Sequence, residues 1–215
     1  MNSLKSGTLE EKEIIAKNSI LDAIEKAKNP FVLFDGDNYS VIILHMVREI
    51  QKTPVLFIDT SVKFKEIYQF IEKMRKLWGF KLIRESNEAV LKTIKFGEDR
   101  NKCCNMLKTK AIEDAIKKHN IDILFAYEDE EIKKDMELFK IEDSQIVIYP
   151  IMHFSREDVL NYIKKYNLPY CSLYDKGYKD IQCTPCTLPI TPKDEQLEKQ
   201  DEEEIKKRLK ALGYM

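Results

Sequence analysis

The feature that most limits the fold of this chain is a regular alternation of short strand-like runs with amphipathic stretches. The strand-like runs lie at residues 31–34, 54–58, 81–84, 121–127 and 145–151. Between them, apolar residues recur at helical spacing, as at Phe64, Ile67, Phe70, Ile71 and Met74. Strands that alternate with helices in this way predict a doubly wound α/β fold, with a mostly parallel sheet flanked by helices. In such folds, ligands lie beyond the carboxyl ends of the strands.

Four of the five cysteines form two pairs that are far apart in the sequence. Cys103 and Cys104 are adjacent, and Cys183 and Cys186 form a Cys-x-x-Cys motif. Two such pairs suit a four-thiolate metal site or an iron–sulfur cluster. Neighbouring side chains point in different directions, which is awkward for one zinc ion but not for a cluster with separate iron corners. A helix predicted from Cys103 to His119 would add the positive end of its dipole, which favours thiolates.

Other uses of these cysteines remain open. The Cys-x-x-Cys motif also occurs in zinc sites and in redox-active dithiols. The simplest alternative is that the cysteines are buried, inert thiols in a reducing compartment. Cys171 lies outside both pairs, and we predict a structural role for it.

Composition excludes several classes of protein. The chain has 215 residues, enough for one sizeable core, and a formal charge of −1, which gives no sign of a nucleic-acid or anionic-membrane partner. It contains no apolar run of membrane-spanning length and no signal-peptide pattern. The clustered cysteines fit a reducing compartment. We therefore expect a cytoplasmic protein.

Three segments differ in character. Residues 1–30 predict a helical extension that begins with a capping box at Thr8 and carries an apolar stripe of Ile14, Leu21 and Ile24. This stripe would pack against the main domain or against a partner subunit, as in a homo-oligomer. Residues 31–190 form the α/β domain, including an irregular segment, 168–189, that would bring the second cysteine pair to the first. Residues 191–215 predict a charged, solvated helix.

The stretch after the first predicted strand has the form of a phosphate-binding turn but not its charges. Residues 35–40 read Asp-Gly-Asp-Asn-Tyr-Ser. A glycine-containing turn that leads into a helix suits an anion, because free N–H groups point at it. Asp35 and Asp37 place negative charge there instead, and the stretch contains no lysine. We predict an acidic turn that caps the following helix.

Two further acidic features follow predicted strands. Asp59 comes directly after the second strand, where it would contact the ribose or adenine of a nucleotide or cap the next helix. Residues 128–131, Glu-Asp-Glu-Glu, follow a later strand. Four adjacent acids at the start of a helix are usually solvated, although they would also suit a cation.

Four segments resemble the adenylyl-sulfate and phosphoadenylyl-sulfate (PAPS) reductases, from about residue 31 to residue 190. They are Pro169-Tyr170-x-x-Leu173-Tyr174-Asp175-Lys176-Gly177-Tyr178 with Cys183-x-x-Cys186-Thr187, Lys102-Cys103-Cys104 with Lys108, Phe57-Ile58-Asp59-Thr60, and Pro150-Ile151-x-x-Phe154-Ser155. The resemblance implies an adenine nucleotide alpha-hydrolase-like fold. It also implies a [4Fe-4S] cluster on the four paired cysteines, with Lys108 beside it to offset the thiolate charge.

The chain departs from that family at three places. Residues 35–40 keep only Gly36 and Ser40 of the family's Ser-Gly-Gly-Lys-Asp-Ser loop, and residues 127–131 stand where the family has a Gly-x-Arg-Arg-type segment. Both changes introduce carboxylates that would repel a sulfonucleotide. No cysteine follows Cys186, whereas the family attacks sulfur with a cysteine in a Glu-Cys-Gly-Leu-His tail.

Three functions fit this pattern. The first is a cluster-bearing reductive or sulfur-transfer enzyme whose substrate is less anionic, with a thiol or electron donor protein as partner. The second is a non-catalytic electron-transfer, sensor or scaffold subunit. The third is an adenylyl-sulfate or PAPS reductase that takes its thiol from a partner. We predict no catalytic residue from the sequence.

Overall fold

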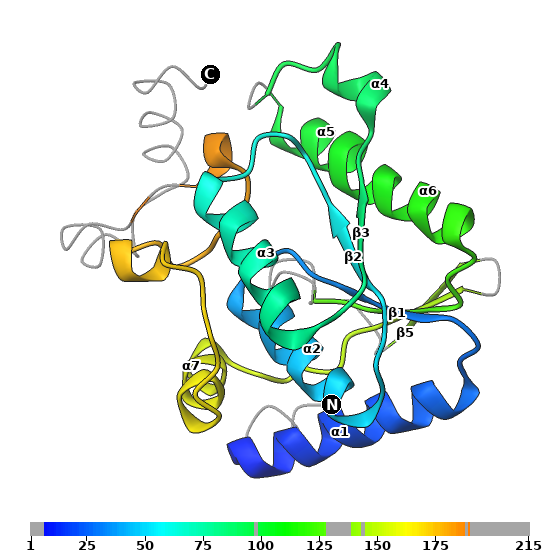
Figure 1. Ribbon diagram of the computed structural model, residues 1–215, viewed down its shortest axis with the longest axis vertical. Coiled ribbons are helices and arrows are strands. Elements are labelled where there is room, and N and C mark those ends of the chain that lie inside the picture. The colour runs from blue at the N-terminus through cyan, green and yellow to red at the C-terminus, as the bar shows by residue number, and fades with distance from the viewer. Residues whose placement is uncertain (1–6, 97–98, 128–138, 143–144, 188, 190–215) are drawn as a thin grey trace.

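The computed structural model describes residues 7–96, 99–127, 139–142, 145–187 and 189, and these form a six-stranded sheet flanked by helices (Figure 1). The strands are β1 (Pro30–Leu33), β2 (Val55–Ile58), β3 (Leu82–Glu85), β4 (Ile123–Phe125), β5 (Phe139–Glu142) and β6 (Gln145–Ile148). Their order is β3-β2-β1-β4-β6-β5, parallel throughout except that β5 pairs antiparallel with β6. The predicted doubly wound, mostly parallel fold is confirmed.

The helices pack on both faces of this sheet. They are α1 (Leu9–Lys26), α2 (Asn38–Ile50), α3 (Lys65–Trp78), α4 (Glu88–Leu91), α5 (Arg100–Cys104), a π-helical turn (Asn105–Thr109), α6 (Lys110–His119) and α7 (Arg156–Lys165). Helices α1, α2, α3 and α7 share one hydrophobic core with the sheet, and α6 shares a second. Figure 1 shows α6 and the α2–α3 pair on opposite sides of the strands.

The two cores follow from the alternation of side chains along each strand. In β1, Val32 faces the larger core and Phe31 the smaller one, and in β2 Phe57 and Leu56 divide in the same way. Both faces of these strands are buried, which explains why they read as continuous apolar runs rather than alternating ones.

The order in which strands are added to the sheet reverses at β1, between its neighbours β2 and β4. From β1 it proceeds outward through β2 to β3, and then crosses back to β4, which pairs with the other side of β1. Crossovers on opposite sides of a strand leave a crevice at their carboxyl ends, and this is where doubly wound proteins bind ligands. The segments that follow β1, β2 and β4 therefore decide what the site can hold.

Helix α1 packs through a different face from the one predicted. Its capping box, Thr8 with Glu11, is present, but the buried apolar residues are Ala16, Ile20 and Ala23. Ile14 and Leu21 are 60% and 43% exposed, so the predicted packing stripe is wrong for these two residues, whereas Ile24 packs against the larger core as predicted. Small residues let the helix axes approach closely.

A partly buried ion pair also holds α1 on the rest of this chain. The ammonium of Lys12 lies 2.6 Å from the carboxylate of Asp158, at the start of α7.

Other local expectations need smaller corrections. Helical structure in residues 87–96 is confined to α4, and the helix expected to begin at Cys103 begins at Arg100. Strand β5 was not expected. The acidic run 128–131 and the charged segment 191–215 lie outside the described residues. Within the described part of the chain, no helix is long and apolar enough to cross a membrane.

Candidate functional site

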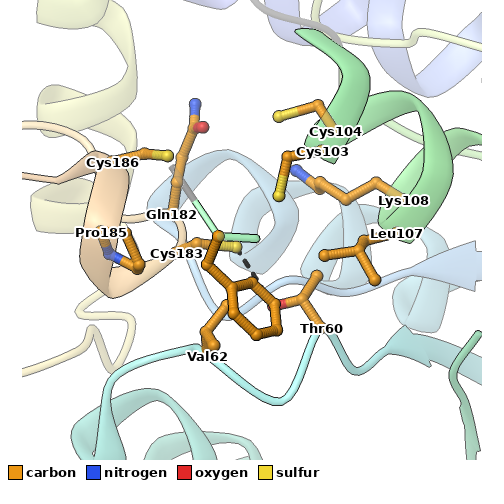
Figure 2. A pocket seen from close by; sticks show the side chains of 11 residues that line it. Thr60, Val62, Cys103, Cys104, Leu107, Lys108, Gln182, Cys183, Pro185 and Cys186 are labelled. Carbon is orange, nitrogen blue, oxygen red and sulfur yellow. Dashed lines mark hydrogen bonds between the residues drawn. The ribbon is translucent and has the colours of Figure 1, made fainter. Parts of the chain in front are cut away.

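The four paired cysteines line one pocket, which we call the cysteine pocket. Cys103 and Cys104 reach it from the end of α5, and Cys183 and Cys186 from the irregular segment after α7. Figure 2 shows the two pairs facing each other across the pocket, with the Lys108 side chain beside the first pair. The cavity among these side chains has a volume of about 10 Å³, roughly the space for one water molecule, and it opens to solvent. The predicted convergence of these two distant segments is therefore present.

A π-helical turn positions the first pair. Residues Asn105–Thr109 interrupt what would otherwise be one α-helix from Arg100 to His119. A π turn widens the helix by one residue, and such turns often occur at functional sites. It allows α6 to bury Ala111 and Ala115 against the sheet while Lys108 lies at the pocket.

The second pair is attached to the loop after β2. Cys183 forms an isolated antiparallel bridge with Lys63, and the Thr184 N–H donates to the carbonyl of Val62 at 2.8 Å. A short 3₁₀ turn, Thr184–Cys186, then brings Cys186 round to the pocket. The Thr60 hydroxyl lies 3.1 Å from the Cys183 sulfur, a hydrogen-bond distance (Figure 2).

The remaining walls of the pocket are mostly apolar. Val62, Phe96, Leu107 and Pro185 line it, together with Gln182 and Lys108. Among the described residues, no three His, Cys, Asp or Glu side chains are grouped closely enough to hold a single metal ion. The pocket thus joins four thiols and one ammonium in mostly apolar surroundings. Cys171, by contrast, is fully buried in the larger core, as its predicted structural role requires.

The turn after β1, residues 35–40, is the second element of the site, and we call it the β1 turn. Asp37 caps α2, accepting from the Ser40 N–H at 2.7 Å, which confirms the predicted capping. Gly36 has a φ of 83°, and a Cβ there would lie 3.1 Å from Ile67 of α3. The fold therefore requires glycine at this position whether or not a phosphate binds.

Two lysines that are distant in sequence meet the β1 turn. The Lys63 Nζ lies 3.0 Å from Asp35 Oδ1, and the Lys108 Nζ lies 3.4 Å from Asp35 Oδ2. The sequence places no lysine within the turn, so its acidic appearance is misleading: its carboxylate is neutralised by cations from elsewhere. Lys63 is a site residue that sequence reasoning missed, because nothing in its local context indicates a long-range ion pair.

Burial and charge act against each other on these groups. Burial alone would raise the pKa of Asp35, but the ammonium groups of Lys63 and Lys108 outweigh it and hold that pKa well below its ordinary value. The Asp35 carboxylate in turn raises the pKa of Lys108. Asp37 behaves differently: burial, and then the neighbouring charge of Asp35, raise its pKa. Lys108 is therefore shared between the β1 turn and the cysteine pocket.

Protein groups already occupy most hydrogen-bond donors at the start of α2. The Asn38 N–H donates to the Tyr174 hydroxyl at 3.1 Å, and the Ser40 N–H donates to Asp37. The rings of Tyr39 and Tyr127, which follow β1 and β4, stack with centroids 3.8 Å apart. The crevice between these strands is thus lined by side chains that contact one another.

Asp59 is held by three protein donors. Its Oδ1 accepts from the Tyr68 hydroxyl at 2.6 Å and from the Ser61 N–H at 2.8 Å, and its Oδ2 accepts from the Arg84 guanidinium. Burial would raise the pKa of Asp59, but these hydrogen bonds lower it overall. The alternative that Asp59 caps the next helix is wrong, since the N-cap of α3 is Phe64. A contact to a nucleotide stays a prediction.

Comparison with known proteins identifies relatives in both sequence and structure. The family model for the phosphoadenosine phosphosulfate reductase domain matches residues 29–189. An adenosine 5'-phosphosulfate reductase from Bacillus cytotoxicus is 31% identical over 162 residues, which cover 70% of this chain and 69% of that protein. A protein of the same name from Geobacillus thermodenitrificans is 27% identical, covering 72% and 71% of the two chains.

Solved structures share the fold at low identity. The PAPS reductase of Candida auris, solved as a phosphate complex, has a TM-score of 0.68 at 19% identity, covering 80% of this chain and 90% of that one. The FMN adenylyltransferase of Candida glabrata, solved with FAD and inorganic pyrophosphate, has a TM-score of 0.67 at 17% identity, covering 84% and 65%.

Proposed function

The chain belongs to the phosphoadenosine phosphosulfate reductase family, and from this premise we propose that it is an iron–sulfur protein of sulfur metabolism. Its four paired cysteines would hold a [4Fe-4S] cluster, and it would carry out reductive or sulfur-transfer chemistry on a substrate other than the usual sulfonucleotide. The observation that carries this proposal is the convergence of two distant cysteine pairs on one pocket next to Lys108.

The donor set suits a cluster better than a single ion. Four thiols are the ligand set of a [4Fe-4S] cluster, and zinc, the alternative, needs its four ligands around one point. Adjacent cysteines such as Cys103 and Cys104 point in different directions, so they would meet two iron corners of a cluster more easily than one zinc ion. When bound, a cluster of this kind supplies one-electron chemistry or local charge, with a potential that depends on its surroundings.

The chain's own residues would adjust that environment. The Lys108 ammonium offsets negative charge at the pocket, and the Thr60 hydroxyl is placed to hydrogen-bond the Cys183 sulfur. Val62, Leu107 and Phe96 give the pocket apolar walls, and a less polar environment strengthens both effects.

The β1 turn argues for a less anionic substrate. The two Candida proteins that share this fold were solved with anionic ligands, one with phosphate and the other with FAD and inorganic pyrophosphate. In this chain, Asp35 and Asp37 add carboxylates to the turn, and Tyr174 takes an N–H of α2. No cysteine follows Cys186 in the sequence, so an attacking thiol would come from outside these 215 residues, for example from a thiol-donor protein.

The test begins with the protein purified and kept without oxygen. Iron and acid-labile sulfide near four per chain, with a cubane electron paramagnetic resonance signal after reduction, support the cluster. One zinc per chain without sulfide contradicts it. Calorimetric titration with adenylyl sulfate, PAPS, AMP and ATP at low salt then tests the substrate. Micromolar binding of either sulfonucleotide would contradict the proposed substrate class and favour a reductase with an external thiol.

The Tyr39–Tyr127 stack favours a second candidate. If these rings keep the crevice closed, the protein would be a non-catalytic electron-transfer, sensor or scaffold subunit. A reversible one-electron couple without sulfite release or sulfur transfer in single-turnover assays supports this role. Turnover in either assay excludes it.

A further inference from the structure

Asp35 is a carboxylate in the turn between β1 and α2, a position where doubly wound folds commonly bind anions. Its two carboxylate oxygens face two different lysines, Lys63 on the β2–α3 loop and Lys108 on the π turn. The Lys63 side chain is 1% exposed, and Asp35 is its ion-pair partner. A carboxylate that bridges two ammonium groups has the charge and donor geometry of a bound oxyanion.

The other donors of the crevice are satisfied in the same way. The Tyr174 hydroxyl and the Asp37 carboxylate accept from the N–H groups of Asn38 and Ser40 at the start of α2. The Asn38 side chain is 5% exposed, and its Oδ1 has no hydrogen-bond partner among the described residues. The polar atom that still requires a partner is therefore an acceptor, which a donor on a ligand would satisfy and an anion would not.

We propose that Asp35 is the specificity-determining residue of this site, a built-in anion that takes the place between Lys63 and Lys108 which a phosphate or sulfate group would occupy. The chain thereby accepts ligands that are neutral or cationic at this end and excludes oxyanions. The exclusion does not depend mainly on repulsion, because the ammonium groups of Lys63 and Lys108 balance the carboxylates of Asp35 and Asp37. It depends on the ion pairs that are already formed, because the ammonium groups of Lys63 and Lys108 both contact Asp35.

This inference deepens the proposed function, on which it rests for the substrate, but its test needs neither the substrate nor the cluster. Inorganic sulfate is titrated into the full chain and into Asp35→Asn, with chloride at equal ionic strength as the reference. Removing the internal carboxylate leaves two ammonium groups free to bind the ion. Asp35→Asn should therefore bind sulfate at least tenfold more tightly than the parent protein, which is the gain expected from about one charge-assisted hydrogen bond. Equal affinity in the two proteins overturns the proposal.

Two controls separate this effect from a general change in charge. Asp37→Asn removes a carboxylate of the same turn that contacts neither lysine in an ion pair, and it should gain little affinity for sulfate. Asp35→Asn/Lys63→Met removes one of the two cations and should lose the gain. A similar gain in Asp37→Asn, or a gain that survives in the double variant, contradicts the proposal.

Asp35→Asn leaves a buried lysine less well paired and will be less stable. Thermal unfolding in sulfate and in chloride provides the second measurement, because a ligand that binds only the folded state raises its melting temperature. Sulfate should stabilise Asp35→Asn more than the parent protein, and should restore its fold if it is unfolded. A variant that sulfate neither binds nor stabilises overturns the proposal.

Discussion

The cysteine pocket and the β1 turn lie side by side at the carboxyl end of the sheet and share Lys108, yet they are built on opposite principles. In the pocket, four thiols from two distant segments face one small cavity. In the β1 turn, Asp35 pairs with Lys63 and Lys108, and Asp37 and Tyr174 accept from the start of α2. The thiols converge on a cavity that Lys108 also lines, whereas the polar groups of the turn are paired with one another.

This difference teaches that the two regions rest on different kinds of interaction, and we expect them to respond separately to substitution. The pocket depends on positions that the reductase resemblance predicts, whereas the turn keeps only what the backbone requires, as at Gly36. Substitutions in the pocket should therefore change cofactor content with little effect on folding. Substitutions in the β1 turn should change the stability of the fold with little effect on cofactor content.

The largest effect is expected for the pocket. Cys104→Ser and Cys186→Ser each remove one thiolate, and we expect anaerobically purified protein to lose more than half of its iron and sulfide relative to the parent. Cys171→Ala is the matched control, since Cys171 lies in the larger core and should keep full iron. Equal loss in all three variants would mean that iron content follows stability and not ligation.

In the turn, Lys63→Met should be the most damaging single change. It leaves the Asp35 carboxylate buried with one partner, and we expect a loss of roughly 3 kcal/mol in the free energy of unfolding, the lower end for a broken buried pair because Lys108 remains. Urea denaturation measures it. Lys65→Met, on the exposed start of α3, should change stability by less than about 0.5 kcal/mol. Similar values for the two would show that the Asp35 pair contributes nothing.

Acid should separate the two carboxylates of the turn. The pKa of Asp35 is lowered by folding, so its contribution is present above the unfolded pKa, near 4, and is lost as the pH falls through the folded value. The pKa of Asp37 is raised, so its contribution to stability grows as the pH falls through the same region.

Chemical denaturation at pH 5, 4 and 3 measures both contributions. Asp35→Asn should flatten the loss of stability in acid, and Asp37→Asn should steepen it. If stability falls with pH at the same slope in both variants, the pKa values of Asp35 and Asp37 are not shifted in opposite directions.

The smallest effect is that of the helix cap. Asp37→Ala removes the acceptor for the Ser40 N–H and should cost about 1 kcal/mol of unfolding free energy, while iron content stays unchanged. Asp22→Ala, an exposed substitution on α1, is the control and should cost less than about 0.5 kcal/mol. A large loss of iron in Asp37→Ala would show that the turn and the pocket are not independent.

The sequence predicted features that depend on local pattern. The buried strands, the amphipathic helix α3 and the caps at Thr8 and Asp37 were all predictable, because periodicity and capping chemistry act over a few residues. The convergence of the cysteine pairs was predictable as well, although only their motif spacing indicated it.

The missing parts are those that depend on contacts between distant segments. The pairing of Lys63 and Lys108 with Asp35 joins residues 28 and 73 positions apart, and no local pattern encodes it. The packing face of α1 was misassigned because Ala16 and Ala23 fit against neighbouring helices better than the larger Ile14 and Leu21. Strand β5 depends on its partner β6.

The π turn at Asn105–Thr109 places a restriction on length rather than on residue identity. A regular α-helix advances about 100° per residue, so one residue more or fewer at this point rotates everything before it by about that angle relative to α6. Side chains within the π turn can be exchanged without altering the rotation of α5 relative to α6. A single deletion would straighten the helix and swing Cys103 and Cys104 away from Cys183 and Cys186. Relatives that keep all four cysteines should therefore tolerate many substitutions here and no change in residue number.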